Sequence, residues 1–146
     1  MPLSRDHHFT LRHALWLRRA AGASDLRAAE RVAREYVDFH RDELAAHMAD
    51  EETIVFPAFE RFDPEGTDRL RGEHREIDAL TARLFATLDG GDDPRPLMEE
   101  LASLLDDHVR YEERAYFMAL QETLPASGIR AMGEAIAQRP RVCPTR

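Results

Sequence analysis

The chain has 146 residues, of which 43% are hydrophobic and 33% charged, a balance typical of one soluble globular domain. Its 28 acidic and 20 basic residues give a formal net charge of −8, which argues against a nucleic-acid partner because that binding depends on Lys and Arg neutralising phosphates. No apolar run approaches the roughly 20 residues that span a bilayer, so we expect no membrane segment. The charged residue Arg5 precedes any hydrophobic stretch, which argues against a signal peptide. Cys143 is the single cysteine, so we expect a cytoplasmic protein without an internal disulfide.

Hydrophobic spacing predicts α-helix along almost the whole chain. Apolar residues recur at steps of three, four and seven, as at Leu97, Leu101 and Leu104, and no stretch alternates for long enough to indicate a strand. Glycine, proline and aspartate divide this pattern into four long helices, predicted at 3–21, 25–62, 63–88 and 94–124. A short fifth helix follows residue 125, and the proline- and arginine-rich residues 139–146 are predicted to be a disordered tail.

Four long amphipathic helices with short connections predict an all-α fold, an up-down-up-down antiparallel four-helix bundle that the fifth helix closes at one end. We expect residues 1–138 to form this single domain. The topology brings distant histidines to similar depths, because His74 lies about 21 Å before the end of the third helix and His108 about 17 Å after the start of the fourth. Histidines of neighbouring helices can therefore meet inside the bundle.

A histidine motif occurs twice among the seven histidines of the chain. Each copy is His-x-x-x-Glu, which places an imidazole and a carboxylate one turn apart on the same helical face. Each copy is preceded, 34 to 39 residues earlier, by a histidine on the preceding predicted helix. The six residues are His8, His47 and Glu51 in the first half, and His74, His108 and Glu112 in the second. The order indicates two related helical hairpins.

These side chains fall on or beside the predicted apolar stripes, which favours a buried metal site over ordinary helix-surface pairs. Imidazoles and carboxylates buried together without a cation would be unfavourable. Imidazole suits iron, zinc, copper and nickel, and carboxylate shifts the preference towards iron or manganese. The absence of cysteine from the group disfavours a structural zinc site. A ferritin-type centre is excluded because no histidine has a glutamate three residues before it.

At these residues the chain resembles a hemerythrin-like (HHE cation-binding) domain, over about residues 3–124. The motifs that carry the resemblance are Asp6-His7-His8-x-x-Leu11, His47-x-x-x-Glu51-Glu52, Glu73-His74-x-x-Ile77 and His108-x-x-x-Glu112-Glu113. The resemblance implies a non-haem centre of two iron ions joined by an oxo or hydroxo bridge. By motif position, the implied terminal ligands are His8, His47, His74 and His108, and the implied bridging ligands are Glu51 and Glu112. His8 is preferred to His7 because the family places an aliphatic residue three positions after its ligand, as Leu11 is here.

The chain departs from the oxygen-carrying members of this family at Asp78. In the oxygen carriers that the chain resembles, the third helix has the pattern His-x-x-x-His. In this chain His74 stands at the first histidine position and Asp78 at the second. Aspartate there can ligate the metal, orient His74, or leave a coordination position open. His7 and His13 are predicted on polar helix faces. His40 is predicted to be a core histidine, or one that contacts a ligand without binding the metal, rather than a ligand itself.

Three functions fit these residues. The first is a di-iron protein that binds or reacts with O₂ or a related small oxidant. The second is a di-iron oxidoreductase that acts on hydrogen peroxide or nitric oxide, and the third is an iron or oxygen sensor that acts through a partner protein. No catalytic residue is assigned, and we expect a monomer or homodimer.

Overall fold

The computed structural model describes residues 2–139, with side chains from residue 6 onward. Helices form nearly all of this part of the chain, and no strand occurs within it, which confirms the all-α prediction. Of the predicted tail, only Arg139 is described, and Cys143 lies outside the described residues. None of the described helices combines the length and apolar character needed to cross a membrane.

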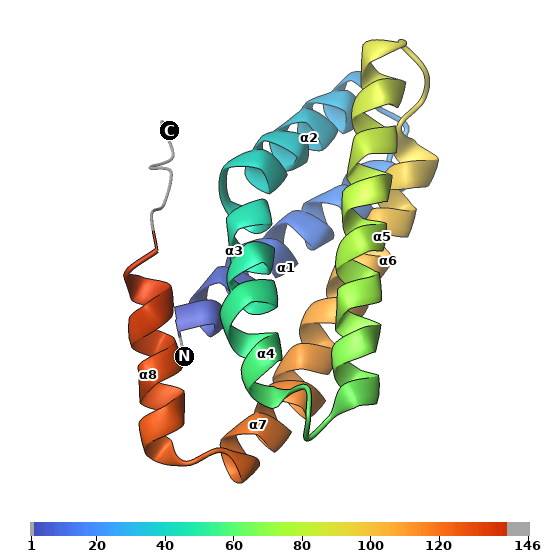
Figure 1. Ribbon diagram of the computed structural model, residues 1–146. Helices are drawn as coiled ribbons and strands as arrows, with labels where there is room; N and C mark the ends of the chain where they lie inside the picture. The colour runs from blue at the N-terminus through green and yellow to red at the C-terminus, as the bar shows by residue number, and fades with distance from the viewer. Residues whose placement is uncertain (1, 140–146) are drawn as a thin grey trace.

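Four long helical runs and a closing helix form the bundle in Figure 1. The first run is α1 (Pro2–Ala21), and the second comprises α2 (Leu26–Phe39), η1 (His40–Leu44), α3 (Ala45–Asp50), η2 (Glu51–Val55) and α4 (Phe56–Phe59). The third run is α5 (Pro64–Asp89), the fourth comprises α6 (Arg95–Tyr111), η3 (Glu112–Tyr116) and α7 (Phe117–Thr123), and α8 (Ala126–Ala137) closes the chain. Helices α5 and α6 lie side by side in Figure 1, and α8 flanks the α3 and α4 end of the second run.

The helix boundaries follow local capping chemistry. The Asp25 carboxylate accepts a hydrogen bond from the backbone N–H of Ala28 at 3.1 Å and begins α2. Asp63 does the same for α5, accepting from Gly66 at 2.9 Å, with proline as the first helical residue. After α5, Gly91 adopts a φ of 77°, a conformation that glycine reaches without steric cost. The aspartate caps confirm the predicted starts of both helices.

Three π-helical turns interrupt the long runs. Turn η2 begins at Glu51 and η3 begins at Glu112, so each starts at the glutamate that ends one copy of the repeated histidine motif. Turn η1 begins at His40 and has no counterpart in the second hairpin within the described residues. Single π turns inside α-helices are rare and are frequently found at functional sites. The two hairpins therefore repeat a backbone irregularity as well as a sequence motif.

The buried apolar side chains form two clusters, one on each side of the histidine motifs. The first joins α1, α2, α5 and α6 and includes Leu17, Leu84 and Leu101. The second joins η2, α4, α5, η3, α7 and α8 and includes Phe59, Leu70, Leu120 and Ile136. Along α5, Leu70 belongs to the second cluster, Ile77 to the first, and His74 lies between them. A polar layer thus crosses the middle of an apolar bundle.

Replacing Leu84 by alanine tests the first apolar cluster. Leu84 is fully buried, so the loss of its side chain should lower the free energy of unfolding by about 2–5 kcal/mol. The neighbouring Phe85 is 55% exposed, and Phe85→Ala should change the free energy of unfolding by about 0.5 kcal/mol or less. Urea unfolding of the metal-free protein, followed by circular dichroism, measures both, and equal losses would contradict the packing described here.

Candidate metal centre

Six buried side chains converge in the polar layer. The side chains of His7, His47, His74 and His108 are exposed by 5% or less, and those of Glu51 and Glu112 are fully buried. They form two overlapping groups, one with His7 and His47 and the other with His74 and His108, and both groups contain the two glutamates. Within each group one ligand atom from every residue lies within 4.8 Å of the others, which is a spacing that could hold a metal ion.

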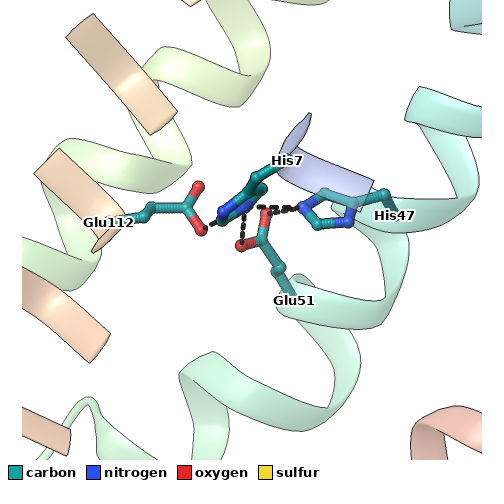
Figure 2. Close-up of side chains that lie close together, drawn as sticks. All are labelled: His7, His47, Glu51 and Glu112. Atoms are coloured by element: carbon teal, nitrogen blue, oxygen red, sulfur yellow. Dashed lines mark hydrogen bonds and ion pairs between the residues drawn. The ribbon is translucent and has the colours of Figure 1, made fainter. Parts of the chain in front are cut away.

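Each glutamate lies between one imidazole of each half. Glu51 Oε1 is 3.4 Å from Nε2 of His47 and 3.0 Å from Nε2 of His74. Glu112 Oε2 is 3.4 Å from Nε2 of His7, and its Oε1 contacts Nε2 of His108. Figure 2 shows the first half, where His7 lies between Glu112 and His47 and beside Glu51. This crossed arrangement is what two carboxylates shared between neighbouring metal positions require.

All four imidazoles present Nε2 to the centre and Nδ1 to a carboxylate on the outside. The outer contacts are His7 to Glu113 at 2.7 Å, His47 to Asp6 at 3.2 Å, His74 to Glu52 at 2.9 Å and His108 to Glu73 at 2.9 Å. Each carboxylate accepts a hydrogen bond from an Nδ1–H group, so Nε2 is the ring nitrogen that faces inward. The four rings are therefore oriented for metal binding.

Two phenylalanines line the centre at equivalent places. The ring of Phe117 stacks on His7 with centroids 5.6 Å apart, and the ring of Phe56 stacks on His74 at 5.4 Å. Each phenylalanine follows a central glutamate by five residues. The two halves of the centre thus repeat the imidazoles, the central and outer carboxylates and the aromatic wall.

The charges of the cluster shift the pKa values of its members. Burial acts to lower the pKa of His47 and His108, but the neighbouring carboxylates, Glu51 and Glu112 respectively, outweigh it and raise both values to about 10. Burial acts to raise the pKa of Glu51, yet the charge of His47 and hydrogen bonds from its neighbours hold that pKa well below its usual range. In the metal-free protein, protonated imidazoles therefore balance buried carboxylates.

The central carboxylates retain unused acceptor capacity. Glu51 Oε2 and both oxygens of Glu112 are buried and accept no hydrogen bond from the described residues. Buried carboxylate oxygens are normally paired, hydrogen-bonded or bound to a metal ion. Nitrogen and oxygen donors without a thiolate suit a borderline or hard transition metal rather than a soft one. The residues present therefore fit a metal centre.

One of the six predicted site residues lies outside the cluster. His8 is exposed and its Nε2 lies 3.3 Å from the guanidinium of Arg12, whereas the adjacent His7 enters the cluster. One residue along a helix turns the side chain by about 100°, so both cannot face the centre. The sequence repeats an acid–histidine pair, Asp6-His7 and Glu73-His74, which favours His7 over His8, although helical spacing alone does not decide between them. The structure brings the other five together.

Two further histidine expectations also change. His7 and His13 do not lie on a polar face, because both are buried, and the ring of His13 stacks on Phe39 at 4.2 Å between centroids. His40 lies outside both metal-ligand groups, and its Nε2 lies 2.8 Å from the carboxylate of Asp78. Asp78 contacts His40 at the α5 surface and is absent from both metal-ligand groups. The outer carboxylates on the imidazole Nδ1 atoms were not predicted at all.

A four-helix bundle with a buried His/Glu centre defines a class of metal-binding proteins, and sequence comparison gives the family. The chain matches the hemerythrin HHE cation binding domain over residues 3–120 and belongs to that family. It is also 30% identical over 92 residues to a protein of Nostoc sp. (strain PCC 7120 / SAG 25.82 / UTEX 2576) named DNA nickase. That match covers 62% of this chain but 26% of the Nostoc protein, so the chain spans about a quarter of that relative. No solved structure matches the chain.

Adjacent histidines provide a matched test of the centre. His7→Ala should weaken metal binding by at least about tenfold, because it removes one imidazole and leaves the buried Glu112 without that partner. His8→Ala should leave metal binding unchanged, since His8 is exposed. Elemental analysis after anaerobic incubation with ferrous iron measures both variants. Equal loss from the two variants would contradict the placement of α1.

Metal binding should also release protons. At pH 7.5, His47 and His108 carry a proton in the metal-free protein because their pKa values are about 10. A metal ion needs the Nε2 lone pair, so filling the centre should release about two protons, and affinity should rise as pH increases towards 10. Calorimetry in two buffers of different ionisation enthalpy measures the release. An identical binding enthalpy in both buffers would show that the rings are already neutral.

Proposed function

We propose that the centre holds two non-haem iron ions joined by an oxo or hydroxo bridge. His7 and His47 would bind one ion, His74 and His108 the other, and Glu51 and Glu112 would bridge them. The support is that each glutamate faces one imidazole of each half. Four imidazoles and two carboxylates also exceed the needs of one ion, and mixed nitrogen and oxygen donors suit iron.

We propose that this protein binds, or reacts with, O₂ or a related small oxidant. Iron in the centre would supply the redox chemistry, and the chain would supply orientation and exclusion of water. The outer carboxylates hold the imidazoles in place, and the rings of Phe56 and Phe117 cover the inner rings of His74 and His7. A buried, enclosed site of this kind favours a small ligand.

A second candidate is an oxidoreductase that acts on hydrogen peroxide or nitric oxide. The contact between Asp78 and His40 favours it, because that aspartate does not join the imidazoles and carboxylates of the centre. Each proposed ion would then have two imidazoles and two shared carboxylates. Iron commonly takes more ligands than four, so both ions would keep positions for an exogenous ligand.

We further propose a cytoplasmic monomer or homodimer without a nucleic-acid partner. The name DNA nickase applies to the Nostoc protein, of which the match covers 26%. The net charge of −8 disfavours binding to a phosphate backbone. The proposed partner is therefore the small oxidant itself.

Anaerobic reconstitution with ferrous iron tests this function. We expect about two iron ions per chain, because two ligand groups share the glutamates. Optical spectra are then recorded after O₂ and, separately, after H₂O₂. A spectral change that reverses on removal of O₂ supports oxygen binding, and sustained consumption of peroxide supports the oxidoreductase. Binding of one zinc ion with no affinity for iron would contradict both, and His108→Ala is the metal-deficient control.

A further inference from the structure

The net charge of −8 is distributed unevenly along the chain. Residues 7–34, which form most of α1 and the first part of α2, contain six arginines and two carboxylates, a formal charge of +4, so the rest of the chain carries −12. No acidic residue occurs between His7 and Ser24, and all six arginines are exposed. A charge asymmetry of this size indicates that one end of the molecule meets an anionic partner.

Exposed apolar side chains gather on the same helix. Among the described residues, seven large hydrophobic side chains are exposed, and three of them lie within eight residues of α1. These three are Phe9, Leu15 and Trp16, with exposed fractions of 40%, 42% and 38%. A group of large apolar side chains rimmed by charged ones marks a site of interaction, whereas single exposed residues do not.

The arginines and the apolar side chains share one face of α1. Phe9 and Trp16 are seven residues apart, as are Arg12 and Arg19, and a step of seven returns a helical side chain to within about 20° of the same direction. The guanidinium of Arg12 lies 5.5 Å from the ring centroid of Phe9 and 5.9 Å from that of Trp16, within the range of cation–π contacts. We call Phe9, Arg12, Leu15, Trp16 and Arg19 the basic aromatic face.

The opposite side of α1 fixes the helix in the bundle. His7 belongs to the metal centre, and Leu17 is buried in the first apolar cluster. The ring of the buried His13 meets the ring of Trp16 edge-on, with centroids 5.1 Å apart, and stacks on Phe39 of α2. The bundle therefore presents the basic aromatic face outward on a helix that is held from behind.

We propose that the basic aromatic face docks the protein on a membrane surface that contains anionic phospholipids. Tryptophan and phenylalanine rings settle at the boundary between lipid headgroups and acyl chains, where Leu15 can also bury its side chain. Arg12 and Arg19, next to these rings, would pair with anionic headgroups. The same surface repels the acidic remainder of the chain, so a single orientation, with α1 against the lipid, is favoured.

The chemistry of the face favours lipid over other partners. A symmetric contact with a second copy of this chain would bring Arg12 and Arg19 close to their own counterparts, and like charges repel. A nucleic acid or an acidic protein would satisfy the arginines but offers no extended apolar phase to the three hydrophobic side chains. A bilayer supplies anionic headgroups and an apolar interior together.

The single tryptophan of the chain is Trp16, so its fluorescence reports directly on this face. The full chain is titrated with vesicles of phosphatidylcholine, either alone or with phosphatidylglycerol as the anionic lipid. With the anionic vesicles only, we expect the emission to move to shorter wavelength and to be quenched by lipids that carry bromine in their acyl chains. Added salt should weaken the binding, because charges at an exposed surface are screened.

Two double variants separate the charged and apolar contributions. Arg12→Gln/Arg19→Gln should lower the partition coefficient for the anionic vesicles by about tenfold or more, because each arginine near such a surface contributes about a factor of five. Phe9→Ser/Leu15→Ser should also lower it and should reduce the quenching by brominated lipid. Circular dichroism checks that each variant keeps the helical bundle.

The matched control is Arg75→Gln/Arg83→Gln, which removes the same charge from exposed positions of α5 and should change the partition coefficient by less than about twofold. No binding to anionic vesicles, equal binding to neutral ones, or an equal loss in the control would overturn the proposal. An emission shift that depends on protein concentration without vesicles would assign the face to a second copy. A response to polyglutamate or to an oligonucleotide, but not to vesicles, would assign it to another polyanion, and either result would refute the docking on lipid.

Discussion

The architecture depends on keeping two carboxylates charged in the middle of an apolar bundle. Glu51 and Glu112 are fully buried between the two hydrophobic clusters, where an isolated carboxylate would be strongly disfavoured. Imidazoles from four helical segments meet these two side chains, and in the metal-free protein His47 and His108 hold protons that balance the charge. Those protons would be released to solvent when the same Nε2 atoms bind a cation. The negative charge of the buried carboxylates is thus balanced by protons without metal and would be balanced by the cation with it. This balance allows the bundle to form before metal binds.

The π-helical turns explain the spacing of the aromatic walls. Five residues along a regular α-helix rotate a side chain by about 500°, which leaves it about 140° away from the first residue. A π turn has more residues per turn, and its extra residue returns the fifth side chain close to the original face. Glu51 and Phe56 span η2, and Glu112 and Phe117 span η3, so each glutamate and phenylalanine can face the centre together.

Much of this organisation could be predicted from the sequence, because helical spacing and repeated order are local properties. The bundle, its aspartate caps and five of the six central residues follow from them. The choice between His7 and His8 does not, since it depends on a 100° rotation that α1 settles through contacts with His47 and Phe117, far away in sequence. The π turns are equally hidden, because a fixed 3.6-residue period places Phe56 and Phe117 away from the glutamates. The acidic neighbours of the motifs are visible in the sequence, but the imidazole that each one holds is set by tertiary packing.

The pairing of outer carboxylates with imidazoles links the helices into a single unit. Asp6 of α1 contacts His47 of α3, Glu52 of η2 contacts His74 of α5, Glu73 of α5 contacts His108 of α6, and Glu113 of η3 contacts His7 of α1. No imidazole of the centre takes this contact from its own helical run, so a change at one ring is transmitted to a neighbouring run through a charged hydrogen bond. Metal binding that fixes the four Nε2 atoms would therefore also fix the relative positions of all four runs. The free energy of metal binding would then add to the free energy of unfolding of the bundle, because the ligands come from all four runs.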